Sequence, residues 1–339
     1  MKIKISVILL FLSFLVSFIP LAYAKTSGYL SFGYVKGEKE SEFYYGTFHD
    51  PNVGLMFFDE IVAKVNFFAE MRFHEGDTFE LDQAWVGINP SESFNLRFGL
   101  YLVPFGKYNE SSRPHETMLI TVPLNVESLY PQRWRDIGIL TQGRWGGLIY
   151  SAYIGNGLAE SQDLKGGQQF KDNNRDKGKG VRIGWMLQQG FEVAYSHYQG
   201  KFDDGNIRKL VMHGFDATWM TTEGFQILAE YAKSQIENPE EFSEGKAEGY
   251  FVQCSFVIES LRPVLSYQKL KYNDRFHGPG FIGLESSGEG ISIDKSRWAF
   301  GVVFVFSQKL LLKVEYDWNK ESEAKLKDNA LYFQMAYSF

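Results

Sequence analysis

The sequence contains one cysteine, Cys254, among 339 residues, which excludes an internal disulfide framework and a zinc site built from several cysteines. Its six histidines are scattered, with no pair at metal-ligand spacing. Acidic residues outnumber basic ones by 41 to 35, so the chain lacks the basic excess that nucleic-acid phosphates require. Serine-hydrolase, P-loop and metalloprotease motifs are missing as well. These absences predict no metal, no cofactor, no nucleic-acid partner and no enzymatic activity.

Long apolar runs are confined to the N-terminus. Lys2 and Lys4 form a basic start, an apolar stretch covers about 5–19, and Ala22-Tyr23-Ala24 matches the small-x-small cleavage rule. Residues 1–24 are therefore predicted to be a signal peptide, with an uncleaved membrane anchor as the alternative. After residue 25 no run approaches the roughly 20 apolar residues that a spanning helix needs. We expect 25–339 to form a single exported domain that is either soluble or crosses a membrane as strands.

The chain is rich in aromatic residues, 17% of the total, and in alternating apolar and polar side chains. The alternation recurs over 61–73, 94–102, 181–188, 298–306, 310–318 and 331–339, and it indicates strands. A β-sandwich also alternates, but strands of about 10–12 residues have the length that a tilted strand needs to cross hydrocarbon. Only a closed barrel leaves no unpaired backbone groups in lipid. We therefore predict an all-β fold, a transmembrane antiparallel β-barrel.

The predicted connections alternate between short turns and long loops, which is typical of short periplasmic turns and long extracellular loops. The second strand is interrupted by Pro51, which does not suit a central strand, so the first long loop could lie later in the chain. The sixteen predicted strands cover roughly 27–37, 43–59, 61–73, 78–89, 93–105, 136–146, 147–156, 178–189, 190–200, 208–220, 224–236, 247–258, 262–273, 294–306, 309–319 and 328–339.

Charged residues on these strands are predicted to face the lumen, because a charge on the lipid face costs about 2–4 kcal/mol near the membrane midplane. Cys254 is predicted to face lipid as a small hydrophobe. Aromatic residues at strand ends, including Tyr101, Trp185 and Trp318, are predicted to form interfacial girdles. The predicted lumen-facing residues are Lys64, Arg72, Arg97, Arg144, Arg182, Lys313, Glu70, Glu192, Glu230, Glu315 and Asp317. Among them, Arg97, Arg144 and Arg182 either form one basic patch or pair with acids across the lumen.

Three segments of the chain resemble the phosphate-selective porin O/P group and its uncharacterised relatives. They are NLRFGLYLVPFG at 95–106, TMLITVPL at 117–124 and RWRDIG at 133–138, and the terminal Phe339 resembles the last residue of bacterial outer-membrane proteins. The resemblance covers about 60–145. It implies a sixteen-stranded, usually trimeric channel in the outer membrane of a Gram-negative bacterium. A basic excess that would match the arginine ladder and lysine cluster of phosphate-selective members is missing here.

The resemblance also implies that the third long loop folds inward and narrows the channel. Here that loop is 104–135, the longest predicted connection, and long loops in compact barrels are usually functional. Its nearly balanced charges predict a slight preference for anions. The alternative is a loop on the rim with solvated charges. The candidate constriction residues are Lys107, Glu110, Arg113, His115, Glu116, Glu127, Arg133 and Arg135.

Together these features predict a porin through which small hydrophilic solutes or ions diffuse, assembled as a homotrimer in contact with outer-membrane lipid. The alternatives are a structural barrel that sheathes a partner protein and an outer-membrane barrel enzyme. The sequence does not identify the solute.

Overall fold

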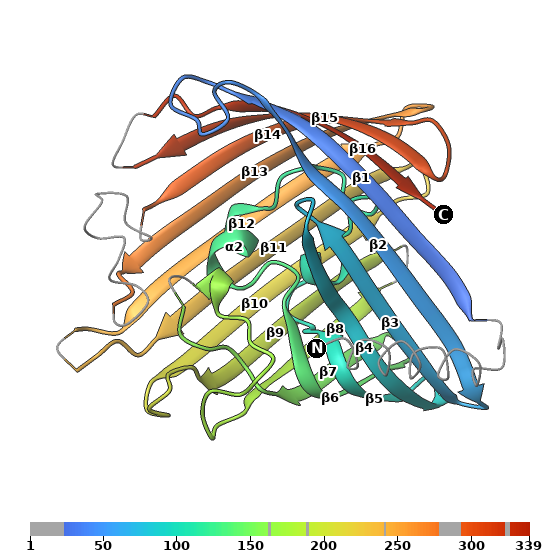
Figure 1. Cartoon of the computed structure of the whole chain (residues 1–339), viewed down its shortest axis with the longest axis vertical. Helices are drawn as coiled ribbons and strands as arrows, with labels where there is room; N and C mark the ends of the chain where they lie inside the picture. Colours follow the sequence, from blue (N-terminus) through green and yellow to red (C-terminus); the bar gives the residue numbers. More distant parts are fainter. Residues whose placement is uncertain (1–23, 162–163, 188–189, 241, 278–292, 323–325) are drawn as a thin grey trace, which may run out of the picture.

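The computed structural model describes residues 24–161, 164–187, 190–240, 242–277, 293–322 and 326–339. Sixteen antiparallel strands close into one barrel, in which each strand pairs with its neighbours in sequence and β1 pairs with β16 (Figure 1). The predicted fold class and strand number are confirmed. In the described part of the chain, no helix is long and apolar enough to cross a membrane. The predicted signal peptide lies outside the described residues, apart from Ala24.

The strand boundaries differ from the predicted ones by a few residues. They are β1 (Lys25–Gly37), β2 (Thr47–Val62), β3 (Val65–His74), β4 (Thr78–Ser91), β5 (Phe94–Leu102), β6 (Arg135–Trp145), β7 (Leu148–Gly155), β8 (Gly178–Leu187), β9 (Phe191–Lys201), β10 (Lys209–Met220), β11 (Phe225–Ile236), β12 (Gly245–Phe256), β13 (Leu261–Asp274), β14 (Lys295–Val305), β15 (Leu310–Glu321) and β16 (Ala330–Ser338).

Side chains alternate between the inside and the outside of the barrel, as the two-residue period of a strand requires. On β12, Phe251 is buried inside, whereas Val252 and Phe256 are exposed on the outer surface. Cys254 lies in the same outward row as Val252 and Phe256. Not every aromatic residue fits the predicted girdles, because Tyr101 is fully buried among interior side chains instead. Trp185 and Trp318 are exposed on the outer surface, as a girdle requires.

The β2 strand continues through the segment that contains Pro51. Asp50 has a positive φ of 51°, and the pairing of β1 with β2 shifts register between Ser31 and Gly33. This irregularity is a β-bulge, where a proline can be accommodated inside a sheet. The first long connection is therefore 38–46 and does not extend past the proline.

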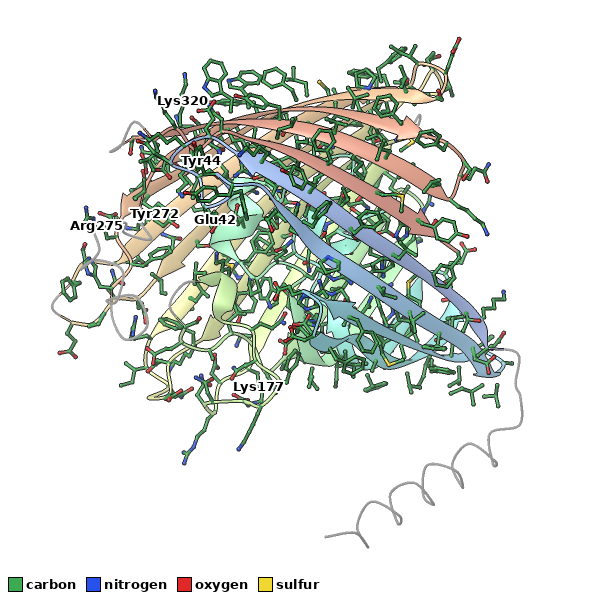
Figure 2. All side chains as sticks on the ribbon, turned by 45° about the horizontal axis from the view of Figure 1, so that its top comes forward. Glu42, Tyr44, Lys177, Tyr272, Arg275 and Lys320 are labelled. Carbon is green, nitrogen blue, oxygen red and sulfur yellow. The ribbon has the colours of Figure 1, made fainter. Side chains whose placement is uncertain are left out.

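The connections at one end of the barrel, here called the turn side, are all short. Those at the other end, the loop side, are longer, except for the β3–β4 connection at 75–77. The β2–β3 connection on the turn side is only Ala63-Lys64, and Lys64 is exposed there with a φ of 68°. The prediction of Lys64 as a lumen-facing strand residue is therefore wrong. The alternation of apolar and polar residues over 61–73 continued across this turn, so it concealed the boundary between β2 and β3. Figure 2 shows Lys177, Arg275 and Lys320 at the opposite, loop-side end.

Candidate constriction loop

The longest connection, Val103 to Trp134, lies inside the barrel rather than on its rim. It contains the short helices η1 (Tyr108–Ser111) and α2 (Leu124–Leu129), and α2 lies within the ring of strands (Figure 1). The two ends of the segment are joined by Asn109, which is completely buried. The Asn109 side chain donates to the carbonyls of Val103 at 2.9 Å and Trp134 at 3.0 Å, and it accepts from the Trp134 amide at 2.7 Å. These three hydrogen bonds hold the two ends of the loop together and fix the direction in which the loop enters the lumen.

Glu230 on β11 anchors the first part of the loop. Its carboxylate is almost fully buried and accepts hydrogen bonds from the backbone amides of Lys107 at 2.9 Å and Tyr108 at 3.1 Å. The Tyr130 hydroxyl donates to the other carboxylate oxygen. Gly106 precedes these amides with a φ of 68°, and a β-carbon there would lie 2.4 Å from the Glu230 carboxylate. The loop can approach Glu230 this closely because residue 106 is glycine.

Glu70 on β3 anchors the loop a second time, through arginines. Arg113 donates to both carboxylate oxygens of Glu70, at 2.8 and 2.7 Å, and Arg133 donates to one of them at 2.9 Å. Arg133 also reaches Asp82 on β4 at 2.8 Å, and Arg135 pairs with the same carboxylate group at 2.7 Å. Glu70 and Asp82 are fully buried, so three of the predicted constriction residues are held in buried ion pairs.

The far wall of the barrel holds the tip of the loop. Glu315 on β15 accepts from the Thr121 amide at 3.1 Å, the Thr121 hydroxyl at 2.6 Å and the Ile120 amide. Lys313, two residues earlier on β15, donates to the Pro114 carbonyl and the Thr117 hydroxyl. The segment that connects β5 to β6 therefore crosses the lumen and is held on β15. Glu70, Glu230 and Glu315, all predicted to face the lumen, hold it at three places on the barrel wall.

The pKa values of ionisable residues in the loop are shifted by burial and by these ion pairs. Burial lowers the pKa of His115, whose ring packs 5.1 Å from the Tyr29 ring, so the imidazole is neutral at pH 7. Burial alone would lower the pKa of Arg113, but the carboxylates of Glu70 and Glu116 raise it above its ordinary value. The arginine stays charged and bound.

One side of the lumen is filled with apolar side chains. Loop residues Phe105, Val126, Leu129 and Trp134 pack against inward residues of the strands. Inward residues on β7–β13 that belong to this cluster are Tyr153, Tyr198, Leu210, Met212, Ala232, Ile236, Ala247, Phe251 and Leu270. These apolar side chains fill the loop-side part of the interior next to β7–β13, and this packing was not predicted from the sequence.

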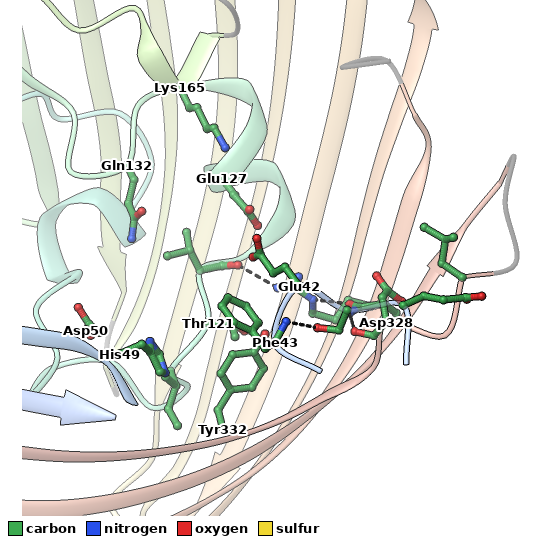
Figure 3. Close-up of a pocket in the computed structure, with 17 residues that line it drawn as sticks. Glu42, Phe43, His49, Asp50, Thr121, Glu127, Gln132, Lys165, Asp328 and Tyr332 are labelled. Carbon is green, nitrogen blue, oxygen red and sulfur yellow. Dashed lines mark hydrogen bonds between the residues drawn. The ribbon is translucent and has the colours of Figure 1, made fainter. Parts of the chain in front are cut away.

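Polar cavities lie on both sides of the loop. The loop-side cavity, about 790 Å³, is lined by Thr121, Tyr332 and five carboxylates, and Lys165, Glu127 and Glu42 converge within it (Figure 3). A turn-side cavity of about 750 Å³ contains the predicted residues Lys107, Glu110, Arg144, Arg182 and Glu192. A smaller one of about 350 Å³ is also lined by Lys107 and Glu192, together with Glu116. The five carboxylates of the loop-side cavity belong to Glu40, Glu42, Asp50, Glu127 and Asp328.

The predicted arginines of the strands do not form one patch. Arg182 pairs with Glu192 at 2.7 Å and with Asp216 at 2.6 Å. Arg97 lies over the Trp85 ring, 4.1 Å from its centroid. Arg144 is exposed near the β6–β7 turn, where it donates to the Gly146 carbonyl.

The remaining predicted residues also form separate ion pairs instead of one common patch. Arg72 pairs with Glu80 at 2.5 Å and with Asp82 at 3.1 Å. Lys107 pairs with Glu192 at 3.3 Å and approaches Glu110 at 3.9 Å. Glu116 pairs with Arg113 at 3.0 Å. Asp317 is fully buried and lies 3.4 Å from Arg297 on β14.

A family model described as Gram-negative porin matches residues 23–324. This chain belongs to the Gram-negative porins. The porin part of the predicted resemblance is thereby confirmed, as is the predicted location in the outer membrane.

The porin is similar to several known proteins. An uncharacterised protein of Aquifex aeolicus (strain VF5) is 30% identical over 133 residues, which are 37% of this chain and 30% of that protein. The anion-selective porin from Comamonas acidovorans has a TM-score of 0.67 at 9% identity, covering 93% of this chain and 99% of that one. In vitro folded OmpT of Vibrio cholerae, trimer form, has a TM-score of 0.66 at 11% identity, covering 93% and 99%.

Several residues of this porin's interior were missed by sequence reasoning. Asp82 was missed because β4 carries a register shift opposite Glu70 and Met71. Asp82 and Gln83 are both buried there, so the alternation breaks directly after Asp82. Arg297 also lies on an inward row, but it falls at the start of a strand whose apolar face dominated the pattern. Asp216 had an available signal, because it continues the inward phase of Leu210 and Met212 on β10.

Proposed function

We propose that this porin is a passive channel for small hydrophilic solutes or ions, with the loop Val103–Trp134 as its constriction. The observation that carries the proposal is the crossing of the lumen by this loop, held on Glu70, Glu230 and Glu315 from three walls. Polar cavities on both sides of the loop support it, since hydrophilic solutes need a polar lining. Family and fold both favour a channel over an enzyme.

Charge preference is proposed to depend on the cavities more than on the loop arginines. Arg113 and Arg133 are bound to Glu70, so their charge is already compensated. The loop-side cavity has five carboxylates but only two lysine or arginine side chains, Lys165 and Arg297. We therefore expect cations to be favoured at the loop-side entrance, in place of the slight anion preference expected from the sequence.

We further propose that the protein is a homotrimer surrounded by outer-membrane lipid. The Vibrio cholerae relative in its trimer form supports this assembly. Support also comes from the outer surface. On β3, β4, β6 and β7 the outward residues near the loop side are Phe73, Phe79, Leu81, Ile137 and Ile154, all of them uncharged.

Planar bilayer recording tests the channel proposal. Folded, purified protein should produce stepwise ion conductance, and a folded protein that never conducts would refute the proposal. Reversal potentials in a salt gradient should show cation preference, and Arg113→Ala should change channel noise more than it changes selectivity. A periplasmic protein recovered in stoichiometric amounts with a non-conducting barrel would favour the partner-sheathing alternative.

A further inference from the structure

The turn-side cavity of about 350 Å³ has an apolar wall. Met118 and Leu119 contribute to it from the loop, and Met220 and Leu228 contribute from β10 and β11. Hydroxyl and amide groups complete the uncharged part of the lining, and Gln253 on β12 is one of them. A cavity of this volume that combines apolar side chains with a few polar groups is typical of a small-molecule site.

The apolar surface continues from the loop onto the wall formed by β13, β14 and β15. Leu119 packs in one buried cluster with Val264 and Val303, and Met118 lies against the same cluster. Gly301 makes room for this contact, because a β-carbon there would lie 2.6 Å from the Leu119 side chain. A lumen wall of this kind favours contact with the apolar part of a solute over contact with water.

Each charged side chain that lines this cavity is already paired with a group of opposite charge. Lys107 lies 3.3 Å from Glu192, and Glu192 is also paired with Arg182 at 2.7 Å. Glu116 is paired with Arg113 at 3.0 Å. The lining therefore offers neither a free carboxylate for a cationic ligand nor a free ammonium group for an anionic one.

Arg262, at the turn-side end of β13, carries an uncompensated charge beside the cavity. It shares the inward phase of Val264, and its Nη1 atom lies 3.1 Å from the sulfur of Met118, which lines the cavity. Its Nε atom is buried without a hydrogen-bond partner, and among the described residues no carboxylate lies within ion-pair distance of the guanidinium. A thioether sulfur is only a weak acceptor, whereas a carboxylate fits the planar guanidinium with two hydrogen bonds.

A free guanidinium beside an apolar wall selects a ligand with two parts. We propose that Arg262 and this cavity bind a carboxylate carried by a short aliphatic chain, as in a monocarboxylic acid or an apolar amino acid. The carboxylate pairs with Arg262, and the chain lies against Met118 and Leu228. The proposal names a solute class for the proposed channel and rests on that function. A cation with the same chain would find no free partner here.

Equilibrium dialysis of the detergent-solubilised protein against labelled hexanoate tests this site. Wild type should bind hexanoate at least about tenfold more tightly than acetate, because each additional buried methylene strengthens binding. Hexylammonium, which has the same chain and the opposite charge, should bind more weakly than hexanoate. Arg262→Gln should lower the hexanoate affinity by about tenfold, since a charged hydrogen-bond donor is lost. The matched control, Arg175→Gln, changes an exposed arginine on the β7–β8 connection and should bind as wild type.

Further comparisons separate the two parts of the ligand and its two sources. Met118→Gln keeps the length of the side chain but not its apolar character, so it should weaken hexanoate binding and leave acetate binding unchanged. Norleucine is hexanoate with an added ammonium group. Tighter binding of norleucine than of hexanoate would identify amino acids as the ligands, and the reverse order would identify monocarboxylic acids.

Two results would overturn the proposal. One is equal binding of hexanoate and hexylammonium by wild type, a comparison that remains valid if Arg262→Gln fails to fold. The other is equal hexanoate affinity in Arg262→Gln and Arg175→Gln. Arg262→Lys keeps the positive charge and should retain the preference for hexanoate over hexylammonium. Binding is measured without a membrane, so a barrel that binds hexanoate but never conducts would refute only the channel function.

Discussion

Gly106 occupies a left-handed backbone conformation directly beside the Glu230 carboxylate. Two separate costs would follow from a side chain here. The first is the conformational cost of a positive φ, about 1–2 kcal/mol for an L-residue. The second is the displacement of Glu230, which holds the amides of Lys107 and Tyr108. The position therefore joins backbone geometry to the anchoring of the loop.

Gly106→Ala is predicted to destabilise the folded barrel more than Gly76→Ala. Gly76 also has a positive φ, 88°, but a β-carbon there would meet nothing within 4 Å. Gly76→Ala should therefore show only the conformational cost, and Gly106→Ala a further loss of about 1–3 kcal/mol from overpacking. Urea unfolding of the two variants in detergent measures the difference. Equal unfolding free energies would show that Glu230 can move aside freely.

Asp328 gives the loop-side cavity a pH response. Burial, followed by the nearby Glu321 carboxylate, raises the pKa of Asp328 above its ordinary value. The group therefore takes up a proton earlier than an exposed aspartate as the pH falls, and the cavity loses negative charge. We predict that acidifying the loop-side chamber reduces cation preference, as measured by reversal potential. Asp328→Asn should remove part of this response, and a response identical to wild type would exclude Asp328 as its source.

At the scale of elements, the loop is held by groups that become costly when they lose their partners. Glu70 is fully buried, and Arg133 is nearly so. Removing one member of a buried ion pair typically costs about 3–5 kcal/mol, since the other charge stays buried without compensation. The free-energy cost of releasing the loop from the barrel wall therefore depends on whether an ionised Glu70 is present.

Glu70→Gln is predicted to release the loop while leaving the barrel closed. Arg113 and Arg133 would lose their shared carboxylate, so the segment should become accessible to trypsin at Arg113, and single-channel current should become noisier. Glu75→Gln, at an exposed position on the β3–β4 connection directly after the end of β3, is the control. A Glu70→Gln protein that resists trypsin like wild type would show that Glu230 and Glu315 hold the loop without Glu70.

The strands were predictable from the sequence, but the partners of their inward side chains were not. Alternation identified all sixteen strands because one face of each must be apolar in lipid. It could not tell that Leu210, Met212 and Phe251, which break the polar inner row, are covered by the loop. Nor could it show that Arg113 and Arg133 meet Glu70, because such contacts depend on how the loop crosses the barrel.

At the scale of the whole molecule, the interior and the exterior are both divided into sectors. The apolar cluster fills the interior against the loop-side part of β7–β13, so solutes are expected to enter through the loop-side cavity, which Asp50 and Tyr332 line. On the other side of the loop, the turn-side cavities lie against β7–β12. Outside, Lys233, Lys269 and Lys271 lie in outward rows of β11 and β13. The outward residues near the loop side of β3, β4, β6 and β7 are uncharged, and we call them the uncharged face. A lipid-facing sector and a subunit-facing sector would produce this asymmetry.

Phe79→Lys is predicted to dissociate the homotrimer, whereas Phe215→Lys leaves it intact. Both phenylalanines point outward and are equally exposed, 54% and 55%, but Phe79 lies on the uncharged face and Phe215 in the row of Tyr195 and Tyr231. A lysine near the membrane boundary costs only about 0–1 kcal/mol in lipid, so both barrels should still insert. In a trimer, Phe79→Lys would bring new charges into the subunit contact. Light scattering of the detergent-solubilised proteins gives their masses, and a Phe79→Lys protein that keeps the wild-type mass would place the subunit contact elsewhere.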